Sequence, residues 1–146
     1  MPTRYGLLFV LLVPAAHAQT AADSSAIRAT ALDYVEGWYE GNPERMTRAL
    51  HPELVKRIVV SDTTTKRSVL QNMGATALVN GTRHGWGKET PTDRRQKDVT
   101  ILDIFGNAAS VKAVMADWID YLQIARVDGR WVIVNVLWER KPERKG

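Results

Sequence analysis

The sequence predicts an α+β domain whose helices come first and whose sheet comes second. Two observations lead to this fold class. Apolar residues recur at helical spacing through 27–38, and four apolar runs joined by tight turns fill 98–138. Helices that precede the strands, without helix–strand alternation, favour a curved sheet that carries its helices on one face.

The first predicted helix starts at an N-cap within Asp23–Ser25, whose short oxygen-bearing side chains can accept from the first turn. It ends at Gly41. One face of this helix is apolar and includes two aromatic rings. That face consists of Ile27, Ala31, Tyr34, Val35 and Trp38.

A second, shorter helix is predicted after Asn42, with Pro43 at its first position, where a missing N–H costs nothing. Pro52 favours extended backbone at His51, and 52–60 is expected to be a helical turn that leads into a strand.

A surface turn follows at 61–66, and Ser68 is expected to cap a third helix over Val69–Leu78. A glycine-rich loop at 80–91 then leads to the sheet.

Four strands form the predicted antiparallel meander, at 98–105, 108–115, 118–127 and 130–138. Asp128-Gly129 between the last two is a strong hairpin signal, because both central residues of a type I′ turn need positive φ. Gly106-Asn107 is a weaker signal of the same kind. Strands joined in this way need no helical crossover.

Residues 1–18 have the features of a secretory signal peptide: Arg4, an apolar run at 7–13, and the small-x-small pattern Ala16-His17-Ala18. The run is shorter than the roughly 20 residues that span a bilayer. We therefore expect cleavage after Ala18, a secreted or periplasmic product and no membrane span after cleavage. The domain would occupy 19–140, followed by a charged tail at 141–146.

The composition of the chain argues against several classes of function. The formal net charge is +4, the basic residues are scattered, and no aromatic–basic motif indicates nucleic-acid binding. The chain has no cysteine, so disulfides and thiolate zinc sites are excluded. With two histidines after residue 18 and no phosphate-cradling glycine pattern, neither a metal site nor a cofactor is predicted.

Four stretches resemble the putative lumazine-binding family of the nuclear transport factor 2-like (NTF2-like, or SnoaL-like) superfamily. They are Tyr34–Met46, Ala49–Arg57, Asn107–Lys112 and Asp120–Trp138. The resemblance implies a cone-shaped, cystatin-like fold with a pocket between the concave sheet face and the first helix. The superfamily hosts isomerases, dehydratases and binding domains, so the resemblance implies no single chemistry.

Asp120 and His51 are the candidate catalytic residues. A carboxylate among apolar neighbours would have a raised pKa suited to a general base, although Asp120 could equally be a surface carboxylate. His51 lies at a break between elements, where its ring could face a ligand or bond the local backbone. A dyad of the two would be a familiar arrangement in the superfamily.

Five residues are candidates for ligand binding: Tyr34, Trp38, Trp118, Trp86 and Arg126. Tyr34 and Trp38 lie one turn apart and could be pocket wall or plain core. Trp118 and Arg126 share the strand face of Asp120. Trp86, in the glycine-rich loop, could close over a ligand or lie on a loop with no role.

The function expected from these residues is binding of a small apolar or aromatic ligand without catalysis. One alternative is an isomerase- or dehydratase-like enzyme that uses Asp120 with His51. Another is a purely structural dimerisation module. The last strand is apolar on both faces (Trp131 and Ile133 against Val132 and Val134), so we expect a homodimer through the outer face of the sheet.

Overall fold

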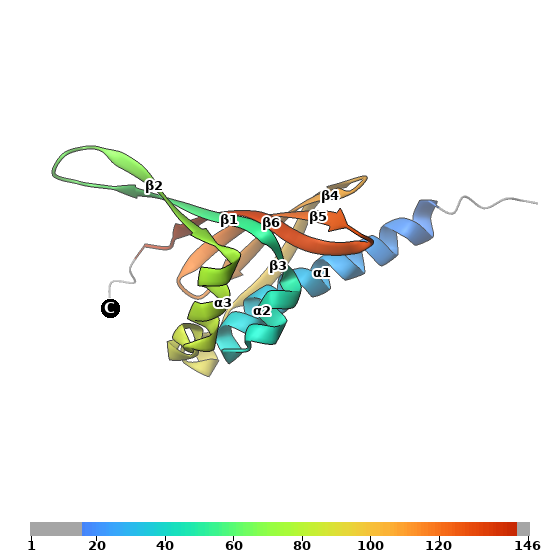
Figure 1. Cartoon of the computed structure of the whole chain (residues 1–146), viewed down its shortest axis with the longest axis horizontal. Coiled ribbons are helices and arrows are strands. Elements are labelled where there is room, and N and C mark those ends of the chain that lie inside the picture. The colour runs from blue at the N-terminus through green and yellow to red at the C-terminus, as the bar shows by residue number, and fades with distance from the viewer. Residues whose placement is uncertain (1–15, 143–146) are drawn as a thin grey trace, which may run out of the picture.

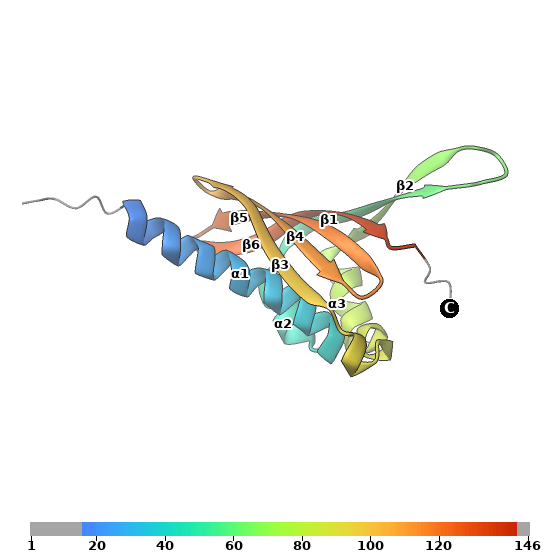
Figure 2. The same cartoon turned by 180° about the vertical axis from the view of Figure 1, so that it is seen from behind.

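The computed structural model describes residues 16–142 and contains one curved six-stranded sheet with its helices on one face (Figures 1 and 2). The helices are α1 (Ala16–Glu40), α2 (Pro43–Ala49) and α3 (Ala75–Arg83), with two short 3₁₀ helices, η1 (Trp86–Glu89) and η2 (Thr92–Arg94). The strands are β1 (Leu50–Ser61), β2 (Ser68–Gly74), β3 (Lys97–Phe105), β4 (Ala108–Met115), β5 (Trp118–Val127) and β6 (Arg130–Arg140).

The sheet has the order β2-β1-β6-β5-β4-β3. Its second half, β3 to β6, is the predicted antiparallel meander. Asp128 has φ 48° and Gly129 has φ 77°, as a type I′ turn requires, whereas Gly106 alone has positive φ in the β3–β4 turn. The first half is an antiparallel hairpin of β1 and β2, and β1 also pairs with β6, in parallel. The α+β class is confirmed.

The predicted third helix is wrong in its first half. Ser68–Gly74 forms β2, and α3 begins only at Ala75. Val69 lies opposite Val60 and Leu70 opposite Val59, so pairing with a β-branched strand outweighs the helical spacing of these residues. The β1–β2 hairpin extends beyond the helices in both views (Figures 1 and 2).

The segment before this hairpin also differs from its prediction. Residues 52–60 form no helical turn, because β1 starts at Leu50 and is extended throughout. The inward positions of β1 are Leu54, Lys56 and Ile58, all buried, and they alternate with more exposed residues.

Helix α1 starts earlier than the sequence predicts, at Ala16 rather than near Asp23. Asp23 therefore caps no helix. Its carboxylate accepts a hydrogen bond from Trp131 Nε1 (3.1 Å) and lies 3.6 Å from the Arg126 guanidinium, so it ties α1 to the sheet. Most of the predicted signal peptide, residues 1–15, lies outside the described residues. No helix of the described part of the chain is long and apolar enough to cross a membrane.

The apolar face of α1 packs on the concave side of the sheet as predicted. Ile27, Ala31, Tyr34 and Val35 are each at most 2 % exposed and belong to the main core. They meet buried side chains from β4, β5 and β6, such as Val111, Leu122, Ile124 and Ile133. The helix thus covers the hollow of the sheet and fixes where a cavity can form.

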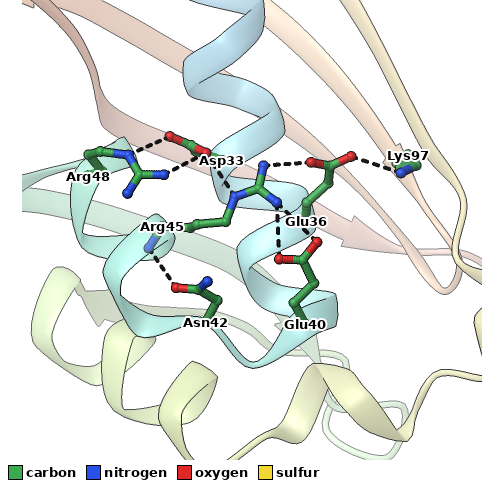
Figure 3. Close-up of polar contacts among 7 residues, drawn as sticks. All are labelled: Asp33, Glu36, Glu40, Asn42, Arg45, Arg48 and Lys97. Atoms are coloured by element: carbon green, nitrogen blue, oxygen red, sulfur yellow. Dashed lines mark hydrogen bonds and ion pairs between the residues drawn. The ribbon is translucent and has the colours of Figure 1, made fainter.

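An ionic cluster on the outer side of α1 holds α2 and β3 in place (Figure 3). Arg45 of α2 donates to Asp33 (2.9 Å), Glu36 (2.5 Å) and Glu40 (3.1 Å), three carboxylates of α1. Lys97 of β3 bonds Glu36 from the other side at 2.8 Å. The cluster connects three elements through one helix face.

This cluster predicts a loss of stability in acid. Hydrogen bonds from Lys97 and Arg45 lower the pKa of Glu36 from its usual 4.5. Burial raises the pKa of Asp33, but hydrogen bonds from Arg48 and Arg45 outweigh burial and lower it below 3.8. Because both pKa values are depressed by folding, the stabilisation is complete above the unfolded values and is lost as pH falls through the folded ones.

Urea unfolding at pH 6 and pH 3 should therefore show a lower free energy of unfolding at pH 3. The loss should be about 1 kcal/mol or less for each ion pair, since these groups remain partly solvated. Arg45→Met should lose less stability between the two pH values than the wild type. An equal loss in both proteins would show that the cluster does not contribute.

Candidate functional site

A cavity of about 230 Å³ lies between α1, α3, η1 and the strands β1, β5 and β6. Its walls are almost entirely apolar and aromatic. Four of the five tryptophans of the chain line it. The lining residues are Tyr34, Trp38, Met46, Lys56, Met73, Leu78, Trp86, Met115, Trp118, Trp138 and Arg140.

Three of the tryptophans form a continuous aromatic wall. Trp118 of β5 meets Trp38 of α1 and Trp138 of β6, in each case edge to face with ring centroids 6.1 Å apart. Such edge-to-face pairs are favoured because the positive edge of one ring meets the negative face of the other. The wall is therefore built by one helix and two neighbouring strands, and its shape depends on how α1 packs on the sheet.

The glycine-rich segment closes one side of the cavity. Gly85 has φ 79°, which turns the chain into η1, and Trp86 then lies against Gly81 of α3. A Cβ at Gly81 would be only 2.7 Å from the Trp86 ring. Trp86 remains 55 % exposed and stacks on His84, so it forms the outer rim of the cavity.

A buried polar trio lies at the inner wall. Tyr34 of α1 donates its hydroxyl proton to Asp120 Oδ2 of β5 at 2.5 Å. Lys56 Nζ of β1 donates to the Tyr34 hydroxyl at 2.6 Å and lies 3.1 Å from Asp120 Oδ2. Asp120 is fully buried, and the other two side chains are nearly so. The trio therefore satisfies its own charges and hydrogen bonds in an apolar surrounding.

Burial sets the protonation of this trio. It raises the pKa of the Tyr34 hydroxyl well above its usual range, and the charge and hydrogen bond of Asp120 add to the effect, so the phenol keeps its proton. Burial also lowers the pKa of Lys56, although the attraction of Asp120 opposes that change. Lys56 Nζ lies 4.9 Å from the centroid of the Trp138 ring, which also favours the cation.

One further polar group of the cavity wall has no hydrogen-bond partner among the described residues. The Trp38 indole N–H is buried, and no acceptor for it lies in the described part of the chain. An unpaired buried donor costs roughly 1–3 kcal/mol, which an acceptor on a bound molecule could recover.

The structure brings together four of the five residues that the sequence marked for ligand binding. Tyr34, Trp38, Trp86 and Trp118 all line the cavity. Asp120 lies beside them, held by Tyr34 and Lys56. Arg126 is not in the lining; it lies 3.6 Å from Asp23, which the Trp131 indole N–H also contacts.

The expected dyad of His51 and Asp120 is not formed. His51 Nδ1 accepts from the backbone N–H of Glu53 at 3.2 Å, so its ring bonds the local backbone, the alternative to facing a ligand. The described hydrogen bonds and ion pairs of the Asp120 carboxylate go to Tyr34 and Lys56. His51 lies in the irregular part of β1, where the pairing with β6 shifts register between Leu50 and Val55, and its ring bonds the backbone two residues further on.

Sequence reasoning missed Lys56 and Trp138. Lys56 lies two residues from both Leu54 and Ile58 and so shares their inward face of β1, a period-2 pattern that the helical turn predicted within 52–60 hides. Trp138 lies opposite Asp120 in the β5–β6 register, which places its ring beside the trio. Within the part of the chain described, no group of three potential metal ligands occurs.

Solved structures share this fold at low sequence identity. An NTF2-like protein from Shewanella baltica aligns with TM-score 0.61 and 18 % identity over 84 % of this chain and 97 % of that one. An NTF2-like protein with a cystatin-like fold from Novosphingobium aromaticivorans gives TM-score 0.63 and 13 % identity over 90 % of both chains.

A putative scytalone dehydratase from the same organism gives TM-score 0.55 and 13 % identity over 86 % of this chain and 89 % of that one. These likenesses show the fold alone. No curated protein matches the sequence.

The family comparison agrees with the stretches that the sequence singled out. A family model described as "Putative lumazine-binding" matches residues 22–139, which include α1 from its second turn, the cavity and the buried trio. The match covers most of the chain, and the fold is that of the NTF2-like structures. The chain therefore belongs to the putative lumazine-binding family of NTF2-like proteins.

Proposed function

We propose that this protein binds a small aromatic or apolar ligand in the cavity roofed by α1, without catalysing a reaction. The observation that carries the proposal is the aromatic lining, in which four tryptophans and Tyr34 surround about 230 Å³. Pockets for drug-sized ligands measure roughly 300–1,000 Å³, so a ligand of one or two fused rings suits this space.

The polar groups of the site support binding rather than turnover. Tyr34, Lys56 and Asp120 direct their hydrogen bonds to one another. A general base needs a free acceptor within reach of a substrate proton. The alternative of an isomerase- or dehydratase-like enzyme with Asp120 as its base lacks its expected partner, because His51 bonds the backbone N–H of Glu53.

Tryptophan fluorescence tests the proposal directly, with 2-naphthalenemethanol as a two-ring probe. Saturable quenching or enhancement is expected, because the probe would lie against Trp38, Trp118 and Trp138. Trp118→Ala should weaken binding about tenfold or more, since one aromatic contact contributes roughly 0.5–1.5 kcal/mol beyond its buried area.

Tyr121→Ala is the matched control for this titration. Tyr121 lies three residues further along the same strand, on the opposite face, and is 45 % exposed. Its loss should leave the affinity for the probe unchanged. A signal that does not saturate, or equal affinity in Trp118→Ala, would contradict binding in this cavity.

We also propose export and self-association. The pattern of residues 1–18 supports a secreted or periplasmic protein.

On the outer face of the sheet, Leu102, Tyr121 and Leu137 line one shallow groove and are each 45–55 % exposed, which supports a homodimer through this face. Sedimentation should then give twice the monomer mass, and Leu137→Glu should shift it to the monomer. A monomer at all concentrations would contradict the dimer.

A further inference from the structure

Lys56 is an unusual wall residue for an apolar cavity. Of the described residues that line it, Lys56 supplies the one primary amine, and its side chain is only 8 % exposed. Its Nζ is held by Tyr34 and Asp120 and faces the Trp138 ring. Desolvating a strongly hydrated ammonium costs free energy even when it is paired, and an apolar residue would fill this wall without that cost, so packing alone does not explain Lys56.

The geometry points to Lys56 as a covalent attachment point for an aromatic aldehyde, which it would hold as a protonated imine beside Asp120. This inference rests on ligand binding in the cavity and names the chemical class of the ligand. A buried lysine in an apolar site, with an acid–base group beside it, is the arrangement that amine attack on a carbonyl requires.

The bond changes balance with the groups present. The Lys56 ammonium gives a proton to the Asp120 carboxylate, 3.1 Å away, and the neutral amine attacks the aldehyde carbon. The carbon–nitrogen bond forms, the carbonyl electron pair moves to oxygen, and that oxygen takes the second amine proton. Asp120 then returns its proton to the hydroxyl, water leaves, and the nitrogen lone pair completes the imine.

The protonated imine keeps the charge balance that the Lys56 ammonium and Asp120 have in the free protein. The site holds one cation and one carboxylate before and after the reaction, so Asp120 remains the counter-ion of the imine. The Tyr34 hydroxyl, 2.5 Å from Asp120, stays within reach to stabilise the carboxylate. The Trp138 ring, over which Nζ already lies, would stabilise the imine cation in the same way.

Burial assists the first step. It lowers the pKa of Lys56, whereas Lys66 and Lys88 are exposed to solvent. The attraction of Asp120 opposes the change, but the same carboxylate accepts the proton that must leave. The amine and its proton acceptor are therefore already in contact.

Reductive trapping tests the inference on the wild-type protein. The protein is incubated with 2-naphthaldehyde and cyanoborohydride at neutral pH, and each lysine is then examined by peptide mass spectrometry. Trapping adds the mass of the aldehyde less one oxygen. Lys56 should be labelled about tenfold faster or more than Lys66 and Lys88, because the cavity holds the aldehyde beside it.

2-Naphthalenemethanol, which has the same rings and no carbonyl, separates the two proposals. If it binds and slows labelling of Lys56, both proposals are supported. If it binds but Lys56 is labelled no faster than Lys66 and Lys88, the imine is wrong and non-covalent binding stands. If neither compound changes tryptophan fluorescence and Lys56 stays unlabelled, both are wrong. None of these readings depends on a variant that must fold without Lys56.

Discussion

Asp120→Ala is expected to lower the free energy of unfolding by about 3–5 kcal/mol, the cost of breaking a buried ion pair by removing one partner. The side chain of Asp120 is fully buried, and it accepts from both Tyr34 and Lys56. Without it, the Lys56 ammonium would remain in an apolar wall with only a phenol oxygen as acceptor. Urea unfolding at neutral pH, followed by circular dichroism, measures the loss.

A double-mutant cycle identifies the cause of that loss. Lys56→Met alone leaves the Asp120 carboxylate buried with one donor, Tyr34, and should also destabilise. Replacing both, in Lys56→Met with Asp120→Leu, removes both charges and should recover most of the stability, since buried pairs exchanged for apolar residues are often neutral. If the double variant loses the sum of the single losses, the ion pair is not what couples these positions.

The loss of stability expected at Asp120 is larger than the loss expected at a surface ion pair. Lys97 and Glu36 form an ion pair at 2.8 Å, but Lys97 is 55 % exposed, so solvent already screens both charges. Lys97→Met should cost about 1 kcal/mol or less. The contrast follows from burial and not from distance, because the Lys56–Asp120 separation is the longer of the two.

Much of the fold could be predicted because its signals are local. The alternation in 108–115 and 118–127 matches the observed burial of β4 and β5, and the Asp128-Gly129 turn needs only two residues to be recognised. The failure at Val69–Leu78 has the opposite cause. The partner of Val69 is Val60, and a hairpin joined by a loop with no strong turn signal cannot be distinguished from a helix by spacing alone.

The site was less predictable than the fold because its polar contacts are long-range. Tyr34 and Asp120 are 86 residues apart, and Lys56 comes from a third element. The alternation of β5 puts Asp120 on the same face as Trp118 and Leu122, but the sequence leaves open whether its carboxylate is buried or at the surface. The donor that meets the Asp120 carboxylate is set by the parallel pairing of β1 with β6. The sequence carries no local signal for this pairing. The sequence therefore favours His51 as the partner of Asp120, whereas the structure places Lys56, five residues further on, against it.

The strictest steric constraint near the cavity lies at Gly87. A Cβ there would overlap the backbone carbonyl of Trp38 and come within 2.6 Å of its ring. Backbone atoms of α1 cannot rotate away as a flexible side chain would, so η1 must move off the helix. Gly87→Ala should therefore destabilise by about 3 kcal/mol, the upper end for overpacking, and should weaken binding of a two-ring probe because Trp38 and Trp86 shift together.

Gly74→Ala is the control for this substitution. Gly74 has φ −91°, and the nearest heavy atom to an added Cβ is the Leu54 carbonyl oxygen at 3.9 Å, an ordinary contact. Because Gly74 is the N-cap of α3, alanine there should cost about 1 kcal/mol or less and leave probe affinity intact. Equal losses of stability at both glycines would mean that the conformational freedom of glycine, and not the room for a Cβ, determines the effect. A larger loss at Gly87, accompanied by weaker binding, would show that the close approach of η1 to α1 shapes the aromatic wall.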